Sequence, residues 1–206
     1  MQSATKTIGN LSPDEIRRLV RDKYSEVAIN PDSKYRFRVG RQYACDLGYP
    51  IPEIQRVPES LADSFTGVSS YLARCEDFAP GDFILELGSG GGLDTALLVR
   101  KVGPSGKIIG IDLSLAMVRK AFIGLGRLGV SQGHCLQAQA EELPLPDSSV
   151  DWVVSNGIFN LSPEKERILE EIHRVLKPQG RVLCSEIVLQ RDLTSEERDN
   201  EDDWFK

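Results

Sequence analysis

A glycine-rich turn follows directly on a short apolar run in the middle of the chain. Four glycines, Gly88, Gly90, Gly91 and Gly92, come after the run DFILEL. Because glycine has no Cβ atom, such a backbone can approach a ligand closely. Asp112 closes the next apolar run, 24 positions after Gly88, near the spacing at which an acid receives the hydroxyls of a bound ribose. Together, the two features predict a site for a ligand that contains a nucleoside.

The residues around this turn narrow the choice of ligand. The dinucleotide fingerprint G-x-G-x-x-G/A requires a third small residue, and Leu93 stands in its place. The carboxylate of Glu86 would repel a pyrophosphate but would suit a ligand with an ammonium group. S-adenosylmethionine carries an adenosine and an ammonium and has no phosphate, so the residues favour it. An NAD-dependent oxidoreductase is the disfavoured alternative.

The elements that must position these residues alternate along the second half of the chain. Short apolar runs rich in branched residues predict buried strands, and the stretches between them have helical spacing. This alternation predicts a doubly wound, mostly parallel α/β sheet. We expect strands at 82–88, 107–112, 133–138, 150–156 and 181–188, and helices at 93–101, 114–128 and 163–177. The last helix is expected to begin with Ser162 as N-cap and Pro163, and to be stopped by Pro178 and Gly180.

The chain divides into three parts. Residues 1–80 form a helical and loop-rich extension, whose first helix opens with Ser12, Pro13 and Glu15 as a capping box. Residues 81–190 form the ligand-binding core, and 191–206 form an acidic segment. Residues 34–43, rich in aromatics and arginine, could be a lid over the strand ends or a basic strip packed on the acidic core.

Composition excludes several classes of function. The 206 residues carry a net charge of −6 and no basic block, which argues against a nucleic-acid partner. No apolar run approaches the length of a membrane span, and the sequence MQSATKTIGN lacks the apolar core of a secretory signal. We therefore expect a cytoplasmic protein with a small-molecule substrate and no membrane partner.

The four cysteines show no metal-binding pattern. Cys45, Cys75, Cys135 and Cys184 form no C-x-x-C pair, so we expect no metal site. Cys135 and Cys184 lie in strand-like runs and are expected to be small buried hydrophobes.

Four segments taken in order carry a resemblance to a known family. ELGSGGG, GIDLS, AEELPLPDSSVDWVVSN and RVLKPQGRVL resemble the motifs of class I S-adenosylmethionine-dependent methyltransferases, a Rossmann-like fold, over residues 82–188. The resemblance implies roles for nine residues. Glu86, Gly88, Gly90 and Gly92 would face the methionine part of the cofactor, Asp112 the ribose, Leu113 the adenine face, Ala140 and Glu141 the adenine amino group, and Asn156 the passage through which the methyl leaves.

Within that superfamily the chain most resembles the arsenite methyltransferase-like group, but it lacks the thiols that the group uses. Gly157 stands where those enzymes typically have cysteine, and residues 64–70 read SFTGVSS without one. Because a soft As(III) centre needs thiolates, arsenite is not expected as the substrate. The methyl acceptor and any catalytic residue stay unidentified, and a cofactor-binding protein without activity is the alternative.

The fifth expected strand would be an edge. Methyltransferases of this class usually add two strands after it, whereas this chain ends at Lys206. We expect that the natural polypeptide continues, that the fifth strand mediates self-association, or that residues 194–205 fold back to shield it.

Overall fold

A computed structural model describes residues 11–74, 77–191 and 194 of the protein. Its centre is a five-stranded sheet in the order β3-β2-β1-β4-β5, in which every neighbouring pair is parallel. The strands are β1 (Phe83–Leu87), β2 (Lys107–Asp112), β3 (Gly133–Gln137), β4 (Val150–Asn156) and β5 (Leu176–Ser185). The strand order reverses between β1 and β4, which in such sheets is where ligands bind. The predicted fold class is confirmed.

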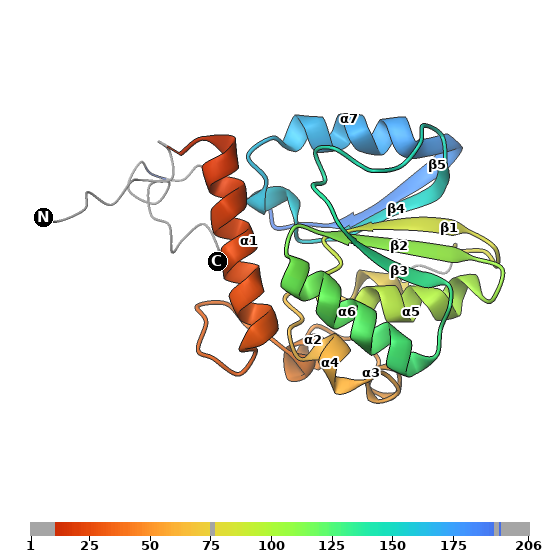
Figure 1. Ribbon diagram of the computed structural model, residues 1–206, viewed down its shortest axis with the longest axis horizontal. Coiled ribbons are helices and arrows are strands. Elements are labelled where there is room, and N and C mark those ends of the chain that lie inside the picture. Colours follow the sequence, from red (N-terminus) through yellow and green to blue (C-terminus); the bar gives the residue numbers. More distant parts are fainter. Residues whose placement is uncertain (1–10, 75–76, 192–193, 195–206) are drawn as a thin grey trace, which may run out of the picture.

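Helices cover both faces of the sheet (Figure 1). α5 (Leu93–Val102) and α6 (Leu115–Leu128) lie on one face, and α7 (Lys165–Val175) lies on the other. Successive side chains of a strand point to opposite faces, so each central strand contributes to two cores. Ile84 of β1 packs in the core that contains α5, and Leu85 packs in the core that contains α7.

The N-terminal part adds one long helix at the carboxyl ends of the strands and three short helices on the outer side of α5 and α6 (Figure 1). They are α1 (Pro13–Ile29), α2 (Arg41–Asp46), α3 (Ile51–Gln55) and α4 (Glu59–Ala62), followed by the 3₁₀ turn η2 (Tyr71–Arg74). A second 3₁₀ turn, η3 (Phe159–Leu161), lies between β4 and α7. α1 begins with the predicted capping box, because Ser12 accepts from the backbone of Glu15 and the Glu15 carboxylate accepts from Ser12.

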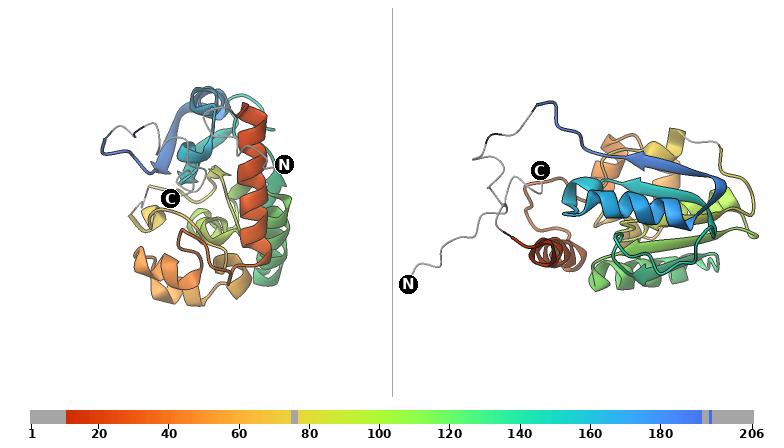
Figure 2. Two further views of the ribbon diagram at one scale, coloured as in Figure 1. Left: turned by 90° about the vertical axis from the view of Figure 1, so that its left-hand side faces the viewer. Right: turned by 90° about the horizontal axis from the view of Figure 1, so that it is seen from above.

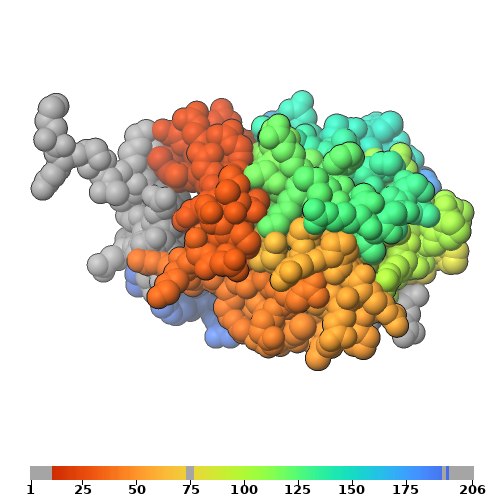
Figure 3. All heavy atoms as spheres, turned by 60° about the horizontal axis from the view of Figure 1, so that its bottom comes forward, coloured from red at the N-terminus to blue at the C-terminus, as the bar shows by residue number. Residues whose placement is uncertain are grey.

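α1 stands across the end of the sheet where the strands finish (Figures 1 and 2). It lies beside α6, as the space-filling view also shows (Figure 3). The hydroxyls of Ser25 and Ser114 lie 2.9 Å apart, and the Lys120 ammonium donates to the Ala28 carbonyl at 2.9 Å. These contacts hold α1 against the start and middle of α6.

The junction between α7 and β5 differs from the prediction. Glu164, and not Ser162, is the N-cap residue, and α7 ends at Val175. Pro178 and Gly180 lie inside β5, which begins at Leu176. The register against β4 is irregular here, and Gln179 has a φ of +69°. An edge strand accommodates proline and a bulge because its outer side has no ladder to maintain.

β5 pairs only with β4 in the described part of the chain, and some of the apolar side chains in and just beyond it are exposed. Val182 is 46% exposed, and Val188, just beyond the strand, is 79% exposed. Cys184 is exposed and Cys135 half-buried, so the expectation that both are buried was wrong. Of the segment 194–205 expected to shield β5, only Thr194 is described, and Cys75 also lies outside the described residues.

Candidate functional site

A cavity opens at the carboxyl ends of the central strands, beneath α1. The open space there, including solvent at its mouth, is about 820 Å³. Seven of the nine predicted site residues line it: Gly88, Gly90, Asp112, Leu113, Ala140, Glu141 and Asn156. The sequence motifs therefore converge on one space, although they are spread over 69 positions from Gly88 to Asn156 (156 − 88 + 1).

The glycines of the turn have different tasks. Gly90 has a φ of +52°, and a Cβ built on it would meet no atom within 4 Å, so its backbone borders open space in the cavity. Gly92 is the N-cap residue of α5, and its Cβ would lie 2.9 Å from the Cβ of Ala121. Gly90 thus leaves room for a ligand, whereas Gly92 lets α5 and α6 pack closely and does not line the cavity.

Asp112 organises the floor of the cavity. Its carboxylate accepts from the Gly90 amide at 2.9 Å and from the Ser114 amide at 2.8 Å. Burial raises the pKa of the Asp112 carboxyl to about 6, against the effect of these two amides. Each carboxylate oxygen has a second acceptor site, so Asp112 can hold the glycine turn and still receive hydroxyls from a ligand.

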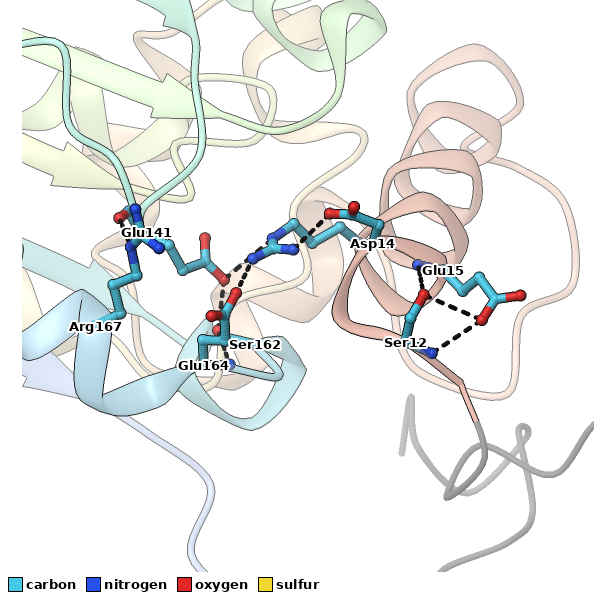
Figure 4. A network of polar contacts seen from close by, with 8 residues as sticks. Ser12, Asp14, Glu15, Glu141, Ser162, Glu164 and Arg167 are labelled. Atoms are coloured by element: carbon cyan, nitrogen blue, oxygen red, sulfur yellow. Dashed lines mark hydrogen bonds and ion pairs between the residues drawn. The ribbon is translucent and has the colours of Figure 1, made fainter.

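Glu141 belongs to a polar network that joins α1 to the loop before α7 (Figure 4). Its carboxylate accepts from Ser162 at 2.6 Å and lies 3.7 Å from the Arg17 guanidinium. Arg17 also pairs with Glu164 and Asp14. The Arg17 side chain is 13% exposed, so this network ties the N-terminal helix to the cavity through a largely buried cation.

Asn156, at the end of β4, holds a segment on the opposite side of the cavity. We call residues 66–70 the strap. The Asn156 carbonyl accepts from the amides of Val68 at 2.9 Å and Ser69 at 3.2 Å. Its amide group donates to Asp94 and to Ser69, each at 3.0 Å, and reaches Tyr49 at 3.1 Å. The carboxamide is therefore fully engaged by the protein.

Glu86 lies beneath the glycine turn and does not line the cavity. It is 3% exposed and accepts a hydrogen bond from Thr95. Burial, and then the nearby Asp94, raises the pKa of the Glu86 carboxyl well above its usual range.

Several lining residues escaped the sequence analysis. Arg17, Val20, Arg21 and Tyr24 all come from α1, and Thr66 comes from the strap. Residues 34–43, offered as a lid, line no part of the cavity; Tyr35 and Phe37 stack on each other there. Arg17, Val20 and Arg21 follow helical spacing, so the sequence predicts that they share one face of α1. It does not predict which part of the protein that face packs against.

The described residues contain neither a metal-binding cluster nor a membrane-spanning helix. Among residues 11–74, 77–191 and 194, no group of three His, Cys, Asp or Glu side chains could hold a metal ion. In the same ranges, no helix has the length and apolarity needed to cross a bilayer.

Comparison with known proteins identifies the family. A family model described as a methyltransferase domain matches residues 79–205. The arsenite methyltransferase of Halobacterium salinarum is 32% identical over 196 residues, covering 88% of this chain and 49% of that protein. The ubiquinone/menaquinone biosynthesis C-methyltransferase of Pasteurella multocida is 40% identical over 118 residues, covering 56% and 44%.

The solved structures agree. The arsenic(III) S-adenosylmethionine methyltransferase of Chlamydomonas reinhardtii superposes with a TM-score of 0.54 at 27% identity, covering 75% of this chain and 51% of that one. The chain spans about half the length of the curated relatives it matches. The family model, the sheet order and the glycine turn lead to one assignment: the chain belongs to the class I S-adenosylmethionine-dependent methyltransferases.

Proposed function

We propose that this protein transfers the methyl group of S-adenosylmethionine to a small molecule. The observation that carries the proposal is the cavity at the strand ends, where Gly90 leaves open space beside the Asp112 carboxylate. This arrangement fits the family's cofactor: Asp112 would receive the ribose hydroxyls, and Leu113, Ala140 and Glu141 would border the adenine. Glu86 and Gly92 would contribute from behind the turn, through charge and through packing.

The bound cofactor supplies an activated methyl group on a sulfonium. The protein then needs mainly to align an acceptor with that group and to exclude water. α1 suits the second task because it covers the cavity with Val20 and Tyr24. The strap and Gly157 would form the wall on the acceptor side. A net charge of −6 favours a small acceptor over a nucleic acid.

Arsenite is the acceptor that the names of the relatives suggest, and the geometry at Gly157 argues against it here. Gly157 has a φ of +86°, and a Cβ built on it would lie 2.9 Å from a Val68 methyl group. A cysteine here would therefore need a strained backbone and a shift of Val68, and no thiol stands at the position to bind a soft As(III) centre. We propose that the acceptor is not arsenite.

The test combines binding with turnover. Calorimetry should show that the protein binds S-adenosylmethionine. Incubation with methyl-tritiated cofactor and a small-molecule extract should yield a labelled metabolite that is heavier by one methylene. Binding without any labelled product from varied extracts would favour the alternative, a cofactor-binding protein without activity, and no binding would refute the proposal.

A further inference from the structure

Two buried carboxyls, Glu86 and Asp94, lie close to the half-buried Asp112 carboxyl that lines the cavity, and all three have neutral partners. Glu86 is bonded to Thr95, Asp112 to two backbone amides, and Asp94, in the first turn of α5, to Tyr49 and Asn156. Glu86 is 3% exposed and Asp94 4% exposed. Buried carboxylates repel one another unless a cation compensates them, so this group of acids favours a ligand that brings positive charge.

Asp94 links this acidic group to the strap. Its carboxylate accepts from the Tyr49 hydroxyl at 2.6 Å and from the Asn156 amide group at 3.0 Å. An ionised carboxylate can only accept hydrogen bonds, so it turns the NH₂ end of Asn156 toward itself. The carbonyl end then faces the amides of Val68 and Ser69.

The groups that face Asp94 come from several elements. Glu86 on β1 lies close to it, and the buried hydroxyl of Tyr71 in η2 lies within its electrostatic reach, as do its partners Tyr49 and Asn156. Burial raises the pKa of the Asp94 carboxyl to about 6 against the hydrogen bonds of Tyr49 and Asn156. A ligand ammonium at the glycine turn, above Glu86, would offset the repulsion between the two acids and favour ionised Asp94.

We propose that Asp94 is a positioning residue that couples the cofactor's ammonium group to the placement of the strap, through Asn156. The coupling rests on the proposed function, since it assigns the ammonium to the glycine turn that lies over Glu86. It means that the wall of the acceptor site is ordered when the cofactor is present, and the acceptor then meets a formed site.

The experiment measures hydrogen exchange of single amides by NMR. The Val68 and Ser69 amides report directly, because they donate to Asn156. S-adenosylhomocysteine, which keeps the ammonium, should slow their exchange by about fivefold or more. 5′-Deoxy-5′-methylthioadenosine, which lacks the amino-acid part, should bind without that effect.

The variants separate coupling from general stability. Asp94→Asn should bind S-adenosylhomocysteine without the added protection of Val68 and Ser69. Tyr49→Phe, a second route that leaves the acid in place, should reduce the protection as well. Asp151→Asn is the matched control: Asp151 lies at the opposite end of β4, paired with Lys177, and its removal should leave the response intact.

The pH dependence gives a readout that a structural role alone would not move. In the wild-type apoprotein, Val68 and Ser69 should be better protected at pH 8 than at pH 5, after correction for intrinsic exchange, and Asp94→Asn should abolish the difference. If the wild type does not bind S-adenosylhomocysteine, the proposed function fails. If it binds while these amides respond equally in wild type and Asp94→Asn, or do not respond, the coupling alone is overturned.

Discussion

Replacing Asp112 by alanine should weaken cofactor binding and loosen the glycine turn together. The Gly90 and Ser114 amides would lose their acceptor, and the ligand would lose a charged acceptor for its hydroxyls. Hydrogen bonds to a charged group contribute about 1.5–3 kcal/mol. We therefore expect a loss of at least about 1.5 kcal/mol in binding, which is roughly tenfold or more in Kd.

Calorimetry at pH 8 is the appropriate assay, because burial raises the pKa of Asp112 to about 6 and the carboxyl is then ionised. Asp112→Asn keeps one acceptor oxygen for the backbone and should fall between wild type and Asp112→Ala. Denaturant unfolding of each variant shows whether binding was measured on folded protein.

A ligand pair isolates the ribose contact from the loosened turn. S-adenosylhomocysteine should bind the wild type more tightly than its 2′-deoxy analogue does, and Asp112→Ala should erase most of that difference. An unchanged Kd for the variant, or an equal preference for the hydroxyl in both proteins, would refute the assignment of Asp112 to the ribose.

Four further outcomes are expected. Gly90→Val should abolish cofactor binding while Gly103→Val should not, although both glycines have positive φ and open space at Cβ; equal binding by the two folded variants in calorimetry would show that the turn is structural. Purified protein with cofactor and thiol should produce no methylarsenicals, and Gly157→Cys alone should not change this because a soft As(III) centre needs more than one thiolate. Methylarsenicals from wild type, detected by mass spectrometry, would disprove the argument. Arg17→Met should speed release of S-adenosylhomocysteine in stopped-flow experiments by about fivefold, because it breaks a largely buried ion pair. The control, Arg38→Met, removes an exposed ion pair with Asp46 and should leave the release rate unchanged. Similar release rates from the two variants would exclude a role for Arg17 in closing the cavity. Burial raises the pKa of Asp94 and Asp112 to about 6, above the value of about 3.9 in the unfolded chain. Between these two values the folded apoprotein binds more protons than the unfolded chain, so its free energy of unfolding should fall as pH rises from about 4 to 6. Denaturant titrations in which Asp112→Asn shows the same fall as wild type would contradict this.

The central strands could be predicted because their local sequence alone indicates a buried strand and its ends. β2 and β4 have the predicted bounds, since each is an apolar run bounded by polar residues. The end of α7 could not be predicted in this way. Pro178 and Gly180 indicate the end of a helix in any sequence, and only the pairing with β4 places them in a bulged edge strand. Local chemistry determined the first case and tertiary pairing the second.

The same distinction applies to the site. Gly90 and Asp112 could be placed from the turn and the strand end, because sheet topology alone brings them together. Tyr24 could not, because its position over the cavity depends on how α1 docks on α6. Asp94 escaped notice for a similar reason: its partners Tyr49 and Asn156 are 45 and 62 positions away.

The roof of the cavity has a consequence for the order in which the molecule assembles. α1 leaves the ribosome before the strands of the sheet, but Glu164, which its Arg17 contacts, lies 147 positions later. Contacts of such long separation form late in folding because the loop they close is long. During synthesis, the contact between Arg17 and Glu164 must therefore wait until four of the five strands have emerged, even though α6, on which α1 also packs, emerges earlier. A cofactor present at that stage, bound by the floor that forms earlier, would add its binding free energy to the docking of α1.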